Sequence, residues 1–170
     1  MIYREVFKEL NKRKVKYVVV GGIAVVVYGV VRFTADLDLV ISLGEKNIDR
    51  FFNAVEKLGY KAKIPVKKKD FKDKKVRQIW ARKKNMIVFS FYHSKDPLKI
   101  IDVFIKQPIR FELLYKNALR IKIKGITIPF ASIRDLKRLK KKTARPQDLI
   151  DIENLKAIEK IKKKDEKRKS

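Results

Sequence analysis

Two aspartates, Asp36 and Asp38, are separated by a single leucine at the start of an apolar segment that ends at Ile41. On a strand, both carboxylates would leave the same face, about 7 Å apart along the chain. Carboxylate oxygens at this spacing suit a pair of Mg²⁺ ions, which are hard cations that prefer oxygen ligands. Asp-x-Asp alone is a common sequence, so the prediction of a metal site depends on the residues around it.

A double glycine and a third acid accompany the two aspartates. Gly21 and Gly22 follow a valine-rich segment and precede another apolar one. A turn of two glycines that leads into a helix leaves backbone N–H groups unobstructed, which suits phosphate. Asp102 lies among apolar residues at 100–104, where a carboxylate is costly to bury unless it is paired or bound to a metal. Asp102 could also do no more than hydrogen-bond a neighbouring turn.

The order of these motifs resembles the signature of the polymerase-β-like nucleotidyltransferases: a Gly-Gly or Gly-Ser turn, a short helix, an Asp-x-Asp pair and a later acid. The matching residues, together with a C-terminal cluster, are Gly21, Gly22, Arg32, Thr34, Asp36, Asp38, Asp102, Lys140, Arg145 and Asp148. The Arg-x-Thr-x-Asp sequence and the C-terminal cluster are most similar to the AbiEii-type branch of toxin–antitoxin and abortive-infection systems. The resemblance extends from about Val15 to Leu155. It departs from the branch at Gln147, where a lysine is frequent, and at Gly22, where many relatives carry serine.

The resemblance implies a metal-dependent enzyme that moves a nucleoside monophosphate from a nucleoside triphosphate to an acceptor hydroxyl. It assigns Asp36, Asp38 and Asp102 as the catalytic carboxylates that hold two Mg²⁺ ions, with Mn²⁺ as a substitute. The residues that it places at the nucleotide are Gly21, Gly22, Arg32, Thr34, Lys140 and Asp148.

Several of these nucleotide-binding roles have structural alternatives. Lys140 lies in a run of lysines and is preferred to its neighbours because its offset from Arg145 matches the family pattern. Arg32 and Thr34 could instead pin a loop. Asp148 and Asp151 could serve only the helix terminus, where an acid is favourable in the first turn, and a salt bridge.

Composition favours an intracellular protein that attracts polyanions. Lys and Arg total 45 against 19 acids, a formal net charge of +26, in a chain of 170 residues that is 45% hydrophobic. A thermophilic composition would add acids along with the lysines, so attraction of RNA or DNA is the preferred explanation. There is no cysteine, which excludes disulfides and thiolate chemistry. The single histidine leaves little room for histidine-based metal sites or catalytic triads. The charged N-terminal segment is unlike a signal peptide, so we expect a cytoplasmic location.

Three classes of function compete at this point. Transfer of nucleotides to RNA, with tRNA implied by the toxin branch, would use both the acids and the charge, and a cognate antitoxin protein would be a partner. Modification of a small molecule such as an antibiotic would need only the acids. A catalytically silent nucleic-acid-binding module would need only the charge. We expect no membrane association, because the uncharged residues 17–31 are fewer than the roughly 20 that span a bilayer.

The elements that position these residues follow from hydrophobic periodicity and punctuation by Gly and Pro. Expected helices cover residues 2–10, 23–31, 48–58, 108–119, 132–140 and 146–161, with a mobile basic loop or short exposed helix at 61–77. Expected strands cover residues 15–20, 36–41, 77–92 with an interruption, 99–105, 121–123 and 126–128. The resemblance implies an α/β (α+β) nucleotidyltransferase fold, a mixed twisted sheet packed by helices. The predicted parts are a core at 1–130, a helical portion at 131–162 that closes the cleft, and a charged, disordered tail at 163–170.

Overall fold

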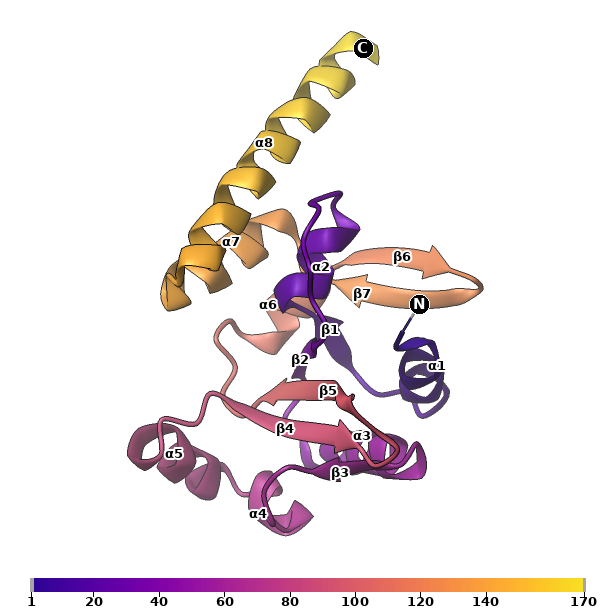
Figure 1. Ribbon diagram of the computed structural model, residues 1–170, viewed down its shortest axis with the longest axis vertical. Helices are drawn as coiled ribbons and strands as arrows, with labels where there is room; N and C mark the ends of the chain where they lie inside the picture. The colour runs from indigo at the N-terminus through magenta and orange to yellow at the C-terminus, as the bar shows by residue number, and fades with distance from the viewer. Residues whose placement is uncertain (1, 170) are drawn as a thin grey trace.

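The order of the strands brings two distant acidic segments together. Within residues 2–169, which the computed structural model describes, seven strands form one mixed sheet in the order β3-β4-β5-β2-β1-β7-β6 (Figure 1). The strands are β1 (Tyr17–Val19), β2 (Leu37–Ile41), β3 (Tyr60–Ala62), β4 (Val88–His93), β5 (Asp96–Phe104), β6 (Leu119–Ile123) and β7 (Ile126–Phe130). The helices are α1 (Arg4–Lys12), α2 (Gly21–Val27), α3 (Glu45–Lys57), α4 (Lys68–Lys72), α5 (Lys74–Lys83), α6 (Phe111–Lys116), α7 (Ile133–Thr143) and α8 (Pro146–Lys169). The expected fold class is confirmed.

The centre of the sheet sets the direction of the acidic side chains. β2 and β5 are parallel neighbours, and their register places Asp38 directly opposite Asp102. The residues on either side of Asp38, Leu37 and Leu39, are fully buried, as are their partners on β5. Since side chains alternate along a strand, burying these leucines in the core turns both carboxylates to the opposite face.

The helices cover the sheet unevenly. α1 and α3 contact each other, and α3 also packs against β3 and α4. α2 contacts β2 and α7, and α7 packs in turn against α8, whose C-terminal half projects away from the sheet (Figure 1). The carboxylates of β2 and β5 therefore have a wall of helices, α7 and the start of α8, on one side.

The region between residues 61 and 92 corrects the expectations for that part of the chain. The expected strand from residue 77 is wrong, because α5 occupies Lys74–Lys83 and the strand begins at Val88. Asp73 caps α5 by accepting the backbone N–H of Lys75 and of Val76. The basic segment before it contains α4, where Lys68 and Lys72 both pair with Asp49 of α3. Part of the positive charge in this segment therefore anchors a helix.

The C-terminal elements follow their sequence signals more closely. Ser132 caps α7 by accepting the backbone N–H of Asp135, as expected from the capping pattern. α8 starts at Pro146 and continues through Lys169, so residues 163–169 extend a helix. Lysine and glutamate have high helix propensity, which explains the helical conformation of this charged segment. That the segment frays, and that the chain divides at residues 130 and 162, stay predictions.

The expectation for residues 23–31 needs adjustment. The helix α2 begins at Gly21 and ends at Val27, and residues 28–36 form an irregular segment that leads to β2. None of the described helices combines the length and the apolar composition needed to cross a membrane.

Candidate active site

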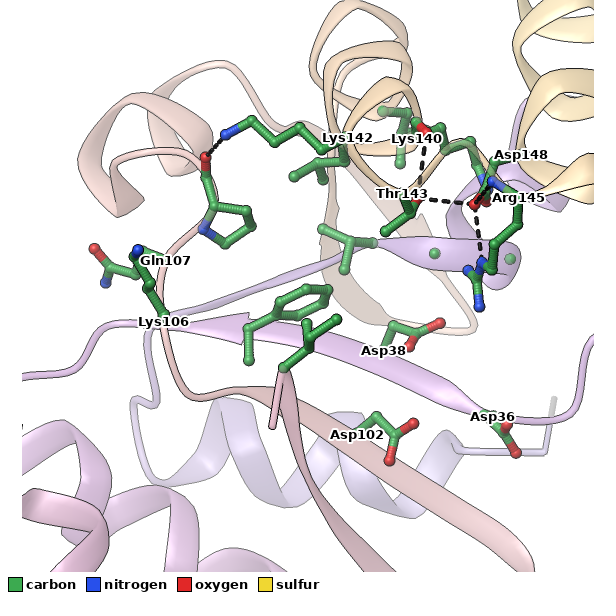
Figure 2. Close-up of a pocket in the computed structure, with 18 of the residues that line it drawn as sticks. Asp36, Asp38, Asp102, Lys106, Gln107, Lys140, Lys142, Thr143, Arg145 and Asp148 are labelled. Atoms are coloured by element: carbon green, nitrogen blue, oxygen red, sulfur yellow. Dashed lines mark hydrogen bonds and ion pairs between the residues drawn. The ribbon is translucent and has the colours of Figure 1, made fainter. Parts of the chain in front are cut away.

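One cleft contains every residue that the sequence assigns to metal and nucleotide. It has a volume of about 730 Å³ and lies between the β2–β5 face of the sheet and the helices α7 and α8 (Figure 2). The predicted residues that line it are Gly21, Gly22, Arg32, Thr34, Asp36, Asp38, Asp102, Lys140 and Asp148. Arg145 of the family-like C-terminal cluster lines it too, and two further basic residues line it without having been predicted, Lys106 and Lys142.

Asp38 and Asp102 form a pair of neighbouring carboxylates. They lie side by side on β2 and β5, and both are half-buried (Figure 2). Burial, the charge of Asp102 and that of Asp36 raise the pKa of Asp38 to about 7, although a backbone hydrogen bond from Gly22 and the charge of Lys140 act in the opposite direction. Burial also raises the pKa of Asp102, against a hydrogen bond from Ser90. Both acids are thus in surroundings that would favour an added positive charge.

A carboxylate oxygen that lacks a hydrogen-bond partner indicates whether this pair could bind a metal. Oδ1 of Asp102 is buried and has no hydrogen-bond partner, which is costly for a carboxylate oxygen. Among residues 2–169, no three His, Cys, Asp or Glu side chains are arranged as a complete metal site. The third acid, Asp36, does not complete such a site, because it precedes β2 and its side chain is exposed. Two carboxylates nevertheless fit Mg²⁺, which is commonly held by one or two carboxylates while phosphates and water fill its other positions.

The double glycine is needed because a side chain would meet Asp38 at the first position and Thr34 and Arg32 at the second. Gly21 has a φ of +64°, and a Cβ there would lie 1.9 Å from Oδ2 of Asp38. A Cβ at Gly22 would lie 2.4 Å from Oγ1 of Thr34 and 3.2 Å from Cζ of Arg32. The serine frequent in relatives would collide here unless the 28–36 segment moved. The glycines therefore let the start of α2 approach the carboxylates of the cleft.

Arg32 and Lys140 converge on one buried acid. Nζ of Lys140 lies 2.6 Å from Oδ2 of Asp151 and 3.2 Å from Oδ1 of Asp148. Arg32 donates to the same carboxylate oxygen of Asp151, whose side chain is fully buried. Gln147 donates to the other oxygen of Asp151 at 3.1 Å. The irregular 28–36 segment is thereby fastened to the junction of α7 and α8.

Asp148 is held in its charged form at the same junction. Burial alone would raise its pKa, but hydrogen bonds from Arg145, Thr143 and Lys140 outweigh burial and hold the pKa well below its ordinary value. Thr143 donates at 2.8 Å and Arg145 at 2.9 Å, as drawn in Figure 2. Asp148 therefore orients the side chains of Lys140 and Arg145, and neither of its oxygens is free to bind a metal. It also belongs to the helix terminus, as the alternative explanation proposed.

The structure distinguishes Lys140 from the next lysine in the run. Lys140 is buried and lines the cleft, whereas Lys141 is exposed and does not. Lys142 lines the cleft as well, and its Nζ donates to the carbonyl of Pro108 at 2.6 Å. Lys140 and Lys142 both remain candidates to contact phosphate.

Sequence reasoning missed the role of Tyr3 and the partner of Asp151. A salt bridge was one expected role for Asp151, and the structure confirms it with Arg32, which is 119 residues away. The hydroxyl of Tyr3 lies 2.6 Å from the carbonyl oxygen of Ala35 and 2.9 Å from that of Ile100, which precede Asp36 and Asp102 closely in sequence. Tyr3 therefore ties together the two acidic segments. No local signal could reveal either contact, because both join distant parts of the chain.

Comparison with known structures places this arrangement in a known fold. A lincosamide antibiotic adenylyltransferase, LnuA, solved with lincomycin bound, has a TM-score of 0.59 at 18% identity, over 90% of this chain and 93% of the other. ANT(2″)-Ia, solved with adenylyl-2″-tobramycin, has a TM-score of 0.54 at 13% identity, over 99% and 97%. A Thermotoga maritima protein assigned to the nucleotidyltransferases has a TM-score of 0.56 at 13% identity, over 90% and 89%. At these identities the similarity shows a shared fold.

Sequence comparison gives the family. No curated protein sequence is significantly similar to the chain. Residues 1–169 match the family described as nucleotidyl transferase of unknown function (DUF2204), and this match spans the sheet, the cleft and α8. The polymerase-β-like superfamily is thus supported, while the AbiEii-type branch stays a prediction. The chain belongs to this nucleotidyl transferase family.

Proposed function

We propose that the protein transfers a nucleoside monophosphate from a nucleoside triphosphate to an acceptor hydroxyl, using Mg²⁺ held by Asp38 and Asp102, with Asp36 completing the site. The carrying observation is the pair of carboxylates with raised pKa values, one of which has an unpartnered oxygen, facing a wall of cations in the same cleft. Negative ligands for the metal and positive ligands for the triphosphate lie opposite each other, as nucleotidyl transfer requires.

Each part of the cleft has a role in this proposal. When bound, Mg²⁺ would orient the triphosphate and lower the pKa of the acceptor hydroxyl. The free Oδ1 of Asp102 can accept the proton that the hydroxyl loses. Backbone N–H groups at the start of α2, beside Gly21, can donate to phosphate oxygens. Lys140, Lys142 and Arg145 would stabilise charge that develops on the leaving pyrophosphate.

We propose RNA as the acceptor because of charge. A net charge of +26 concentrates polyanions near the protein and repels polycations. The AbiEii-type resemblance adds tRNA as the specific acceptor, a toxin role and an antitoxin protein as partner. The second candidate is a small-molecule acceptor, favoured by the two antibiotic-modifying enzymes that share the fold. An aminoglycoside such as tobramycin, being polycationic, suits the charge of this chain poorly.

The test is incubation of the protein with total RNA and each labelled nucleoside triphosphate in turn, in Mg²⁺ and in chelator. Parallel reactions replace RNA by lincomycin or by tobramycin. We expect label to enter RNA only in the presence of metal. Label in an antibiotic but not in RNA would favour the second candidate, and label in neither with any triphosphate would contradict both.

A further inference from the structure

A second pocket adjoins the catalytic cleft. It has a volume of about 440 Å³ and lies between α5 and the segments that follow β2 and β5. The two cavities share Ala81, Lys106 and Gln107, so they form one continuous depression. α5 lies on the same side of the sheet as α7, with the β5–α6 connection running between them (Figure 1). We call this second cavity the side pocket.

The side pocket differs from the cleft in its charges. It is lined by Lys74, Arg77, Arg82 and Lys106 and by no acid, whereas four aspartates line the cleft. Among the described residues, Lys74, Arg82 and Lys106 pair with no carboxylate. A concave surface with several uncompensated cations attracts anions strongly.

Arg77 gives the side pocket a fixed wall. Its side chain is buried, and its guanidinium donates to the carbonyl of Phe71 and to that of Lys72, the latter at 2.7 Å. These bonds hold α5 to the end of α4. The exposed Lys74 and Arg82, at opposite ends of α5, are therefore presented from a rigid helix, with their charged groups available to a ligand.

The distance from the carboxylates suggests what the side pocket binds. Leu43 lies five residues beyond Asp38, and Lys106 lies four beyond Asp102. At roughly 3.3 Å per residue of extended chain, the side pocket is at most about 13–17 Å from the catalytic acids. The side pocket is therefore close enough to the carboxylates to be reached by an acceptor strand whose end lies there.

We propose that the side pocket binds backbone phosphates of a single-stranded RNA acceptor, a few nucleotides from the terminal hydroxyl. This inference rests on the proposed function, because it takes the acceptor end to lie at Asp38 and Asp102. The partly exposed apolar residues Leu43 and Ala81, which line the same cavity, can contact the faces of bases. Regularly spaced phosphates, with bases between them, match a pocket that combines free cations with apolar walls.

The test uses a matched pair of variants in the full chain. Lys74→Gln with Arg82→Gln removes two charges that line only the side pocket. Lys116→Gln with Lys122→Gln removes two exposed charges that line neither cavity and pair with no carboxylate among the described residues. Four ligands are tested for binding to wild type and both variants: a fluorescent dinucleotide, a fluorescent twelve-nucleotide RNA, polyglutamate, and a triphosphate with Mg²⁺. Thermal melts confirm that both variants are folded.

We expect the side-pocket variant to bind the twelve-nucleotide RNA about tenfold more weakly at low salt, with a salt slope smaller by about 1.4. Its affinity for the dinucleotide and for the triphosphate should be unchanged, and the control variant should differ little from wild type. An equal loss in both variants would overturn the proposal, since only general charge would matter. So would an equal loss for polyglutamate and RNA in the side-pocket variant, which would indicate an acidic polypeptide as the occupant. Selective loss for RNA in a protein that binds no triphosphate would contradict the proposed function and still support the RNA site.

Discussion

Two pairs of aspartates lie at or next to the same cleft in different charge surroundings. Asp38 and Asp102 on β2 and β5 are the strand pair, and Asp148 and Asp151 on α8 are the helical pair. Asp38 and Asp102 lie next to each other on parallel strands, with pKa values raised by burial and by the charge of nearby aspartates. Asp148 and Asp151 are at least as buried, with exposed fractions of 2% and 0%, yet each is bonded to cations. Burial alone therefore does not decide what an acid does in this protein. The neighbours that the fold supplies decide it.

The difference separates a site that lacks positive charge from one that already contains it. The helical pair already forms ion pairs with Lys140, Arg145 and Arg32. It therefore holds these cations in place and attaches the segment before β2 to α8. The strand pair has no cation within ion-pair distance among the described residues. Of the two pairs, only the strand pair offers free oxygens to an incoming metal. Substitutions in the two pairs should accordingly affect different properties.

The largest expected effect concerns the strand pair. Asp38→Asn keeps the shape of the side chain but removes a negative ligand for a hard cation. We expect nucleotide transfer to fall by roughly a thousandfold or more, which corresponds to about 4 kcal/mol. Transfer assays with circular dichroism as the check on folding measure this. Near-normal transfer would mean that the metal site lies elsewhere.

The helical pair should respond mainly in stability. Asp151→Asn leaves Lys140 and Arg32 without their shared partner, and breaking a buried ion pair costs about 3 kcal/mol of unfolding free energy. Glu153→Gln is the control, since it breaks an exposed pair with Lys156 and should cost less than about 0.5 kcal/mol. Urea denaturation compares the variants. Equal losses of unfolding free energy in the two variants would show that Asp151 stabilises the fold no more than an exposed acid does.

Stability against pH should reveal the strand pair in the metal-free protein. The pKa of Asp38 rises from 3.8 to about 7 on folding, so the folded state binds more protons between these values. Stability of the wild type should therefore fall as pH increases from about 4 to about 7. Asp38→Asn removes this loss. We expect the free energy of unfolding of the variant to exceed that of wild type by about 2 kcal/mol at pH 8 and to equal it near pH 4. A variant less stable than wild type at pH 8 would show that the charged form of Asp38 does not destabilise the fold.

The smallest expected effect concerns a cation of the wall. Lys140→Ala should weaken triphosphate binding roughly tenfold, or about 1.4 kcal/mol, because one charge-assisted contact is lost. Lys141→Ala should change it little, since Lys141 is exposed and outside the cleft. Calorimetric titration of both variants provides the comparison. Equal small losses would make Lys140 part of a general basic surface.

The predictability of these features follows from how local their causes are. The Gly21-Gly22 turn, the Asp36-x-Asp38 motif and the capped start of α7 at Ser132 are encoded within a few residues, and the structure places the first two in one cleft. α5 was misassigned because its apolar residues are few, and its formation depends on the Asp73 cap and on burial of Trp80. Where local patterns are weak, packing determines the element.

The electrostatic division of the cleft could not be predicted from the sequence. Asp102, Asp148 and Asp151 are single acids whose state depends on partners far away in the chain. Asp151 pairs with Arg32, which is 119 residues away, and Asp102 meets Asp38 only because β2 and β5 are neighbours. The resemblance to known transferases could suggest that Asp148 belongs to the site, but not that it is already saturated by Arg145 and Lys140.

One titration tests the central claim, that Asp38 and Asp102 form a metal-dependent nucleotide site. Each nucleoside triphosphate is titrated into the wild-type protein at moderate salt, in Mg²⁺ and in chelator, and then into Asp38→Asn. We predict that at least one triphosphate binds in Mg²⁺, and that this binding is lost or strongly weakened both in chelator and in the variant. Binding of equal strength in all three conditions, or no binding of any triphosphate in Mg²⁺, would contradict the claim.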